Sequence, residues 1–471
     1  MVAQSVAPSP PTTIPALFLS DIHLDPFSDP AKVARLNAAP VGEWAAILAT
    51  AASHTQMQDV AALSTTCPAR GVDTSNALWL SSLRAIQANA ANASFVTISG
   101  DLLAHVFDCK YKTLLPAATH ADYLAFVEKT IRYELAGLQK TLPGVPIYIG
   151  LGNNDSGCTD YALDPTHDDF LGLTAKIVAE GFPGDLKQAD RDAAMHDFTD
   201  GGNYSTELPA VAHTRLIVLE DTFLSANYVT CSRKPDPAPA AGQIAWLQTQ
   251  LNSAREQHER VWVMGHIPPG VDLYTTARRV PDLCSSGKPK MYLGSEALAD
   301  LLVANADIVT LGIFGHTHSD EMHLLTADPP GGRAGNAFGV PLKTVASITP
   351  INGNHPTFTL ARINPATATL TDYTVVMASN SLGDSTTKWN DEYTYSTAYR
   401  EPAFDGASLA SMIAGFQADP MAQTAASQAY LRNYFPGDAS ALLRLVWPQY
   451  ACSMNHDSGA SFAKCACAAM K

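Results

Sequence analysis

Five short apolar stretches, each ending directly in a cluster of polar residues, place the strongest constraint on how this chain can fold. Four of them contain several β-branched residues, the first consists of Ala, Leu and Phe, and all are closed by Gly or polar side chains, as is typical of buried β-strands. The stretches are 16–19, 95–98, 145–151, 261–264 and 308–314. Helical patterns lie between them, at 76–91, 123–138 and 243–251. Strands that alternate with helices predict an α/β architecture.

The polar clusters share one position, because each of them follows the last residue of a predicted strand. In open α/β sheets, ligands bind beyond the carboxyl ends of the strands. We therefore expect the five clusters to contribute to one site. They are Asp21-Ile22-His23, Gly100-Asp101, Gly152-Asn153-Asn154-Asp155, Gly265-His266 and Gly315-His316-Thr317-His318.

The side chains in these clusters are of the kinds that bind divalent metal ions. Asp, Asn and His are ligands for ions such as zinc, manganese and iron. A single D-x-H or G-H pair occurs by chance, and an isolated His is more often a hydrogen-bonded structural residue. Five clusters that all follow strands argue against chance, so we predict two divalent ions, with zinc favoured over manganese or iron. The predicted ligands are Asp21, His23, Asp101, Asn153, His266, His316 and His318.

After His318 the pattern of the chain changes. Runs at 344–347, 357–363 and 369–376 predict successive strands that form an antiparallel stretch completing a second sheet. From about Trp389 onward we expect helices, with clear patterns at 407–416 and 422–434. The predicted domains are a flexible segment at 1–14, a catalytic domain at 15–386 and a small helical C-terminal domain at 387–471.

In order and spacing, the five clusters resemble the motifs of the calcineurin-like metallophosphoesterase superfamily. Further segments are similar to its acid sphingomyelinase-like phosphodiesterases: 20–26, 265–269, 347–350 followed by Asn354, and a tail with Trp389, Trp447, Tyr450 and Cys452. The resemblance covers about residues 15–470. It implies a β-sandwich of mixed sheets flanked by helices, in which metal-bound hydroxide attacks phosphorus in line.

The resemblance also implies a role for each ligand. Three residues would hold each ion: Asp21, His23 and His318 the first, and Asn153, His266 and His316 the second. Asp101 would bridge the two ions, where its negative charge reduces their mutual repulsion.

Asn154 departs from the superfamily, which usually has His directly after the motif Asn. An amide cannot act as a general acid, although it can donate a hydrogen bond to a phosphoryl oxygen, and we predict that role. Sphingomyelinase-like members carry a His four residues after the bridging Asp, and this chain has His105 there. We predict that His105 protonates the leaving group. The alternative is that it only orients a neighbour.

Charge and cysteine usage restrict the partners and the compartment. The net charge of −15 argues against nucleic-acid polymers and against stable docking on an anionic membrane. The eight cysteines, three of them close together as Cys452, Cys465 and Cys467, predict a tail stapled by a disulfide from Cys452 to one of the other two. This pattern favours a secreted or periplasmic protein, the alternative being reduced thiols. The first residues lack the features of an intact signal peptide.

These observations lead to a predicted function with two rivals. We predict a phosphodiester hydrolase that prefers small soluble phosphoesters, such as nucleotides or choline phosphodiesters. Related enzymes that act on membranes carry a lipid-extracting domain, for which the segment 1–14 is too short. Asn154 favours instead a polyphosphate or phosphomonoester hydrolase, because some endopolyphosphatases share its motif. The third possibility is a catalytically weak metal-containing protein that only binds a ligand.

Overall fold

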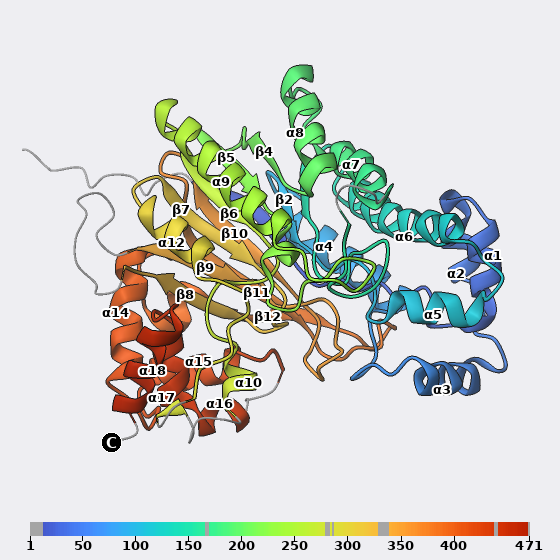
Figure 1. Ribbon diagram of the computed structural model, residues 1–471. Coiled ribbons are helices and arrows are strands. Elements are labelled where there is room, and N and C mark those ends of the chain that lie inside the picture. Colours follow the sequence, from blue (N-terminus) through green and yellow to red (C-terminus); the bar gives the residue numbers. More distant parts are fainter. Residues whose placement is uncertain are drawn as a thin grey trace, which may run out of the picture.

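Two six-stranded mixed sheets form the centre of the molecule, and helices flank them (Figure 1). This computed structural model describes residues 13–164, 169–277, 283–284, 287–327, 339–437 and 441–469. The predicted flexible segment 1–14 lies almost entirely outside the described residues, and the first strand begins at Ile14. The α/β class and the mixed sheets flanked by helices are confirmed.

The first sheet has the strand order β12-β11-β10-β1-β2-β3. Its parallel part consists of β1 (Ile14–Leu19), β2 (Val96–Ser99) and β3 (Ile147–Gly150). Its antiparallel part consists of β10 (Thr357–Asn364), β11 (Thr369–Ala378) and β12 (Trp389–Thr394). The antiparallel strands predicted at 357–363 and 369–376 are thus present. The prediction that they complete a second sheet is wrong, because β10 pairs with β1 and so extends the first sheet.

The second sheet has the strand order β4-β5-β6-β7-β9-β8, with β5, β6, β7 and β9 parallel. Its strands are β4 (Tyr204–Glu207), β5 (Thr214–Val218), β6 (Arg260–Met264), β7 (Val309–Phe314), β8 (Glu321–Leu325) and β9 (Val340–Thr344). The strand predicted at 344–347 is wrong in position, because β9 ends at Thr344. The chain then leaves the sheet, and the backbone N–H groups of Ile348 and Thr349 donate to the carbonyl groups of Ser20 and Asp21.

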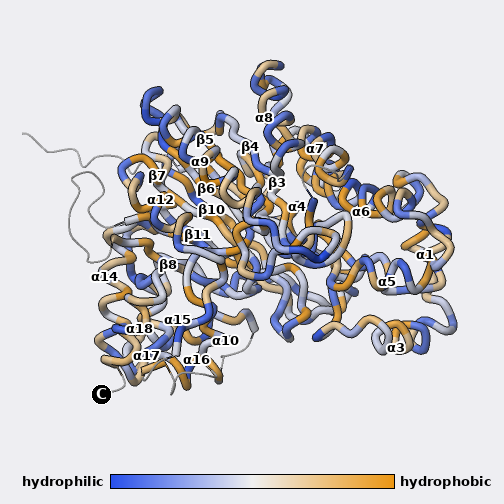
Figure 2. Tube along the Cα trace, viewed as in Figure 1, coloured by the Kyte–Doolittle hydropathy of each residue, from blue (hydrophilic) through white to orange (hydrophobic). Residues whose placement is uncertain are grey.

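Apolar side chains from both sheets meet between them. The ring of Phe18 on β1 lies edge-on to Trp262 on β6, with 6.2 Å between centroids. Both side chains are fully buried, and the Trp262 indole donates to the carbonyl of Ala368 at 2.8 Å. Burying a Phe side chain contributes about 1.5–3 kcal/mol. In Figure 2, hydrophobic residues are frequent along the central strands.

The helices of the first two thirds of the chain connect and cover these strands. The three predicted helices are confirmed as α4 (Asn76–Ala90), α6 (His120–Thr141) and α9 (Ala238–Glu256). Thr119 and Asp122 form a capping box that starts α6, which satisfies two backbone N–H groups that a helix end leaves free. The other α-helices among the described residues of this part are α1 (Val33–Ala38), α2 (Trp44–Leu48), α3 (Gln56–Thr66), α5 (Phe107–Leu114), α7 (Asp169–Gly181), α8 (Gln188–Gly201), α10 (Leu273–Ala277) and α12 (Ala297–Ala304).

The C-terminal part is helical, except at its beginning. The helices are α13 (Tyr395–Tyr399), α14 (Gly406–Gln417), α15 (Ala425–Asn433), α16 (Ala441–Leu445), α17 (Trp447–Ser453) and α18 (Gly459–Ala468). The expected helices at 407–416 and 422–434 correspond to α14 and α15. The expectation of helix from about Trp389 is wrong for the first six residues, because β12 pairs with the edge strand β11. None of the described helices is long and apolar enough to span a membrane.

All eight cysteines are joined in four disulfides: Cys67–Cys109, Cys158–Cys231, Cys284–Cys467 and Cys452–Cys465. The disulfide predicted for the C-terminal segment is confirmed, and Cys465 is the partner of Cys452. The remaining tail cysteine, Cys467, connects α18 to the chain after β6. Disulfides are typical of proteins that fold in oxidising compartments.

Removal of the Cys452–Cys465 disulfide should loosen the tail locally. The two cysteines are 13 residues apart, and closing a loop of this length contributes about 2–4 kcal/mol. The double replacement of both by Ala is expected to lower the free energy of local opening of α17 and α18 by that amount. Amide hydrogen exchange of these helices measures it. Unchanged protection, or recovery of Cys452 and Cys465 as free thiols from unreduced wild-type protein, would contradict this prediction.

Candidate metal centre

The five predicted clusters meet where β1, β2, β3, β6 and β7 end. Several contacts join the sheets at this edge. For example, His316 N–H donates to Asp21 Oδ2 at 3.1 Å, and His266 Nδ1 lies 2.8 Å from the carbonyl of Ser99. The backbone turns sharply here, and five predicted ligands have left-handed φ angles between 48° and 73°. Such angles are costly for residues with a Cβ and are concentrated at functional sites. These residues are Asp21, His23, Asp101, His316 and His318.

The Gly residues of the clusters are required by close packing around the carboxylates. A Cβ on Gly315 would lie 1.9 Å from Ser20 Oγ and 2.6 Å from Asp21 Oδ2. A Cβ on Gly152 would lie 2.3 Å from Asp101 Oδ1. Any other residue at these positions would push the carboxylates away, which explains why Gly precedes the ligand residues.

The seven predicted ligands form two adjoining groups that share Asp101. In the first group, His23 Nε2 lies 3.3 Å from Asp101 Oδ2, and His318 Nε2 lies 3.2 Å from Asp21 Oδ1. One oxygen or nitrogen atom from each of these four residues lies within 4.8 Å of the others.

In the second group, His266 Nε2 lies 3.2 Å from Asp101 Oδ2 and 3.2 Å from Asn153 Oδ1. His316 Nδ1 lies 2.8 Å from the same Asn153 oxygen. Asp101 therefore contacts both groups, as a bridging residue must.

The imidazole rings present the correct nitrogen to the centre. His23 Nδ1 lies 2.8 Å from the carbonyl of Leu103, and His266 Nδ1 contacts the carbonyl of Ser99. Since a carbonyl only accepts, Nδ1 carries a proton in both rings, and Nε2 is the nitrogen that faces the carboxylates and would bind a metal ion. His23 Nε2 is buried and makes no hydrogen bond. A buried nitrogen without a partner, facing carboxylates, fits a bound cation.

The charges of the centre also favour a cation. Burial alone would raise the pKa of the Asp101 carboxyl, but His266 and His23 hold it well below its usual value. Burial would lower the pKa of His266, yet Asp101 and Asp21 raise it to about 10. The potential at the shared carboxylate is therefore strongly negative, and divalent ions would neutralise it.

Two buried carboxylates that we did not single out hold the loops of the centre. Asp155 accepts hydrogen bonds from the backbone N–H groups of Leu102, Leu103 and Gly152. Asp221 accepts from His266 N–H at 2.9 Å and from the next residue. Asp155 lies within a predicted cluster, whereas Asp221 follows β5, a strand that we did not predict. Its position after an apolar run was the available signal.

A second loop supports the other side of the centre. Asn153 Nδ2 donates to Asp160 Oδ1 at 2.6 Å, which turns the Asn153 oxygen towards His266 and His316. The hydroxyl group of Tyr161 lies 3.3 Å from His316 Nε2. The Cys158–Cys231 disulfide anchors this loop to the segment after β5.

Asn154 is close to the metal ligands, but its side chain is engaged by one of them. Its backbone N–H donates to Asp101 Oδ1 and its side-chain amide to Asp101 Oδ2, both at 2.8 Å. Asn154 thus orients the shared carboxylate. Its contact with a phosphoryl oxygen stays a prediction.

His105 lies beside the first group of ligands. Its ring stacks on His23 with 4.1 Å between centroids and lies 5.8 Å from the ring of His318. Its side chain is 27% exposed, in contrast to the buried ring of His23. His105 Nδ1 lies 2.9 Å from a carboxylate oxygen of Asp73, a residue that we did not predict.

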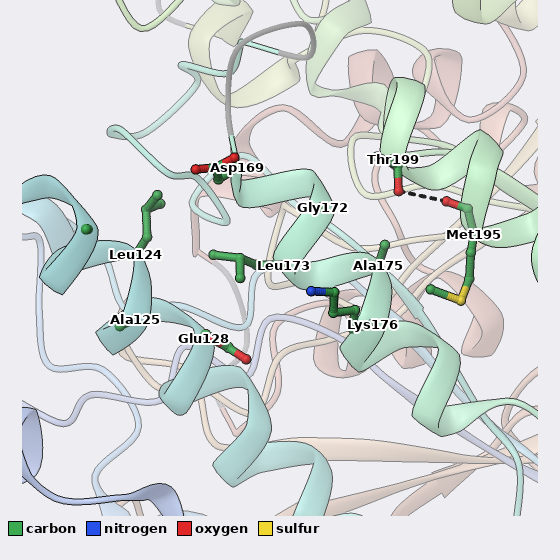
Figure 3. A pocket seen from close by; sticks show the side chains of 11 residues that line it. Leu124, Ala125, Glu128, Asp169, Gly172, Leu173, Ala175, Lys176, Met195 and Thr199 are labelled. Atoms are coloured by element: carbon green, nitrogen blue, oxygen red, sulfur yellow. Dashed lines mark hydrogen bonds between the residues drawn. The ribbon is translucent and has the colours of Figure 1, made fainter.

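A groove of about 540 Å³ lies elsewhere, between α6, α7 and α8 (Figure 3). Its walls include Leu124, Leu173, Lys176 and Met195. None of its lining residues belongs to the five strand-end clusters, so we do not assign the groove to the metal centre.

Comparisons with known proteins agree with this arrangement. The family model for calcineurin-like phosphoesterase matches residues 14–320. The chain is 26% identical over 332 residues to cyclic GMP-AMP phosphodiesterase SMPDL3A of Rattus norvegicus, covering 68% of this chain and 66% of that protein. It is 23% identical to acid sphingomyelinase-like phosphodiesterase 3b of Homo sapiens, covering 81% and 76%.

Among solved structures, a dimetal phosphatase from Danio rerio matches with a TM-score of 0.39 and 11% identity, covering 77% of this chain and 95% of that one. A score this low carries no argument of its own. The family model, by contrast, spans more than half of the chain and includes all seven predicted ligands. The chain therefore belongs to the calcineurin-like phosphoesterase family.

Proposed function

We propose that this protein is a metal-dependent phosphodiesterase that acts on small soluble phosphodiesters. The observation that carries the proposal is the pair of ligand groups joined at Asp101, with the partly exposed ring of His105 beside them. Two relatives, of which this chain covers 66% and 76%, are named as phosphodiesterases, which supports the same reaction class.

The seven side chains would hold two metal ions, with Asp101 as the shared ligand. Asp21, His23 and His318 would complete one site, and Asn153, His266 and His316 the other. When bound, two such ions supply an activated water and neutralise the phosphoryl oxygens. Mixed imidazole, carboxylate and amide ligands suit zinc, manganese or iron, and the share of imidazole makes zinc our first choice.

The remaining requirement, a proton for the leaving oxygen, falls to His105. Its Nδ1 is bonded to Asp73, which leaves Nε2 as the nitrogen that can give a proton to the substrate. Asn154 would keep the shared carboxylate in position and contact a phosphoryl oxygen with its second amide proton.

The charge of the site favours a diester over a phosphomonoester or polyphosphate. Among the described residues, Lys110 is a basic side chain close to His105, and both Asp25 and Asp73 form ion pairs with its Nζ. Lys110 is thus already paired and does not offer its charge to a substrate. A diester carries one negative charge, whereas a monoester carries about 1.5–2 at neutral pH.

Preference for soluble substrates and export of the protein follow from charge and cysteines. The net charge of −15 would oppose docking on an anionic bilayer. The four disulfides support a secreted or periplasmic location. The rival hypothesis of a binding protein without turnover would be supported by the loss of a predicted ligand, and the sequence retains all seven.

A substrate panel tests the proposal. We expect bis-nitrophenyl phosphate and nitrophenyl phosphocholine to be hydrolysed faster than nitrophenyl phosphate, ATP or polyphosphate. Sphingomyelin vesicles without detergent should be the slowest substrate. The Asp101→Asn variant provides the blank for contaminating hydrolases. Faster hydrolysis of polyphosphate would favour the rival enzyme class, faster hydrolysis of vesicles would overturn the preference for soluble substrates, and no turnover at all would support the binding protein.

A further inference from the structure

Asp73 is attached to His105 at two points. Its Oδ1 lies 2.9 Å from His105 Nδ1, and its Oδ2 accepts the backbone N–H of His105, also at 2.9 Å. The Asp73 side chain is fully buried, whereas the His105 ring is partly exposed. A carboxylate that binds both the ring and the backbone of one residue fixes the rotation of the ring.

Asp73 is itself held firmly. Thr349 Oγ1 donates to Asp73 Oδ1 at 3.1 Å, and Lys110 Nζ lies 3.6 Å from Asp73 Oδ2. Burial would raise the pKa of Asp73, but His105, His23 and Lys110 hold it well below its usual value, so the carboxylate is charged. The Cys67–Cys109 disulfide joins the segment that leads to Asp73 to the helix that follows His105.

We infer that Asp73 is a positioning residue, which aims His105 Nε2 at the leaving oxygen of the substrate. This inference rests on the proposed function. The Asp73 carboxylate accepts the proton of His105 Nδ1, which leaves the proton on Nε2 as the one that can be transferred. As the bond from phosphorus to the leaving oxygen breaks, the Nε2 proton passes to that oxygen, and the neutral ring keeps its proton on Nδ1. Asp73 stays ionised throughout.

The test compares substrates with good and poor leaving groups. The Asp73→Asn variant keeps the size of the side chain but removes its charge. We expect this variant to hydrolyse a diester with alkyl leaving groups, such as a dialkyl phosphate or glycerophosphocholine, about 10–100-fold more slowly than wild type does. This is the usual effect of losing a supporting carboxylate. Hydrolysis of bis-nitrophenyl phosphate, whose leaving group needs little protonation, should change by less than about 3-fold. Metal content should not change.

A double-mutant cycle separates positioning from a purely structural role. In the His105→Ala background, Asp73→Asn should have little further effect on either substrate, because the group that it positions is gone. The inference would be overturned if the double variant lost activity by the product of the two single losses. It would also be overturned if Asp73→Asn lost equal activity on both substrates, or if it lost metal.

Asp25→Asn is the matched control. It removes a carboxylate that pairs with the same lysine, at 3.0 Å from Lys110 Nζ, and the contacts of Asp25 do not include His105. The ratio of activities on the two substrates should therefore stay at the wild-type value. A change in this ratio as large as that of Asp73→Asn would also contradict the inference.

If Asp73→Asn does not fold, Thr349→Val carries the test. It removes one hydrogen bond to Asp73 Oδ1 and leaves the charge in place. We expect a loss of about 5-fold, the value of one hydrogen bond, on the alkyl diester alone. An unchanged ratio would overturn the inference. Failure of the proposed function looks different, because wild-type protein would then hydrolyse neither diester.

Discussion

Replacement of Asp101 by Asn is expected to abolish phosphodiesterase activity. Asp101 is the predicted ligand that the two groups share, because its Oδ2 lies 3.3 Å from His23 Nε2 and 3.2 Å from His266 Nε2. The amide has the same shape but no charge, so the repulsion between two cations would no longer be offset. Stabilisation by metal ions is worth several kcal/mol, and 1.36 kcal/mol corresponds to a factor of ten. We therefore expect a loss of at least about 10³-fold.

Initial rates on bis-nitrophenyl phosphate and metal analysis of the same sample measure this effect. Asp29→Asn is the control, since Asp29 is a buried carboxylate that pairs with Ser53 and Lys32, away from the centre. It should keep both its metal and its activity. An Asp101→Asn variant with more than about one tenth of wild-type activity, corresponding to a loss of less than about 1.4 kcal/mol, would contradict the bridging role.

Replacement of His105 by Ala is expected to lower turnover by about 10²–10⁴, the usual contribution of general acid–base catalysis. The ring of His105 stacks on the predicted ligand His23 and is partly exposed. The loss should be largest for alkyl leaving groups and should shrink for nitrophenolate, which leaves without a proton. Metal content should remain at the wild-type value, because the seven ligands are unchanged.

The surface pair of His196 and Asp200 supplies a control for this variant. His196 Nδ1 lies 3.0 Å from Asp200 Oδ2, a pair like that of His105 and Asp73 but 72% exposed at the His. His196→Ala should behave as wild type on every substrate. Equal losses for good and poor leaving groups in His105→Ala would assign His105 to substrate positioning, contrary to the proposed proton transfer.

The strand ends were the most predictable part of this molecule. A buried parallel strand is a short apolar run, and its carboxyl end lies at the same edge of the sheet as those of its neighbours. The sequence alone therefore predicts that Asp101, His266 and His316 lie close together. The register with which β10 extends the first sheet could not be predicted, because pairing between Leu17 and Leu360 is set by contacts far apart in sequence.

The supporting residues were less predictable for the same reason. Asp73 acts on a residue 32 positions later, and Asp221 on one 45 positions later, through hydrogen bonds that leave no local pattern. At β12 the local pattern was misleading, since the segment around Trp389 forms a strand only because the edge of β11 is available for pairing. Tertiary contacts decided both outcomes.

The metal content of active protein tests the central claim most directly. Purified protein should be dialysed against metal-free buffer and analysed for zinc, manganese and iron, together with its activity on bis-nitrophenyl phosphate. We predict two metal ions per chain, loss of activity on removal by a chelator, and recovery in proportion to the metal restored. Full activity in protein that holds one ion or none would contradict the account.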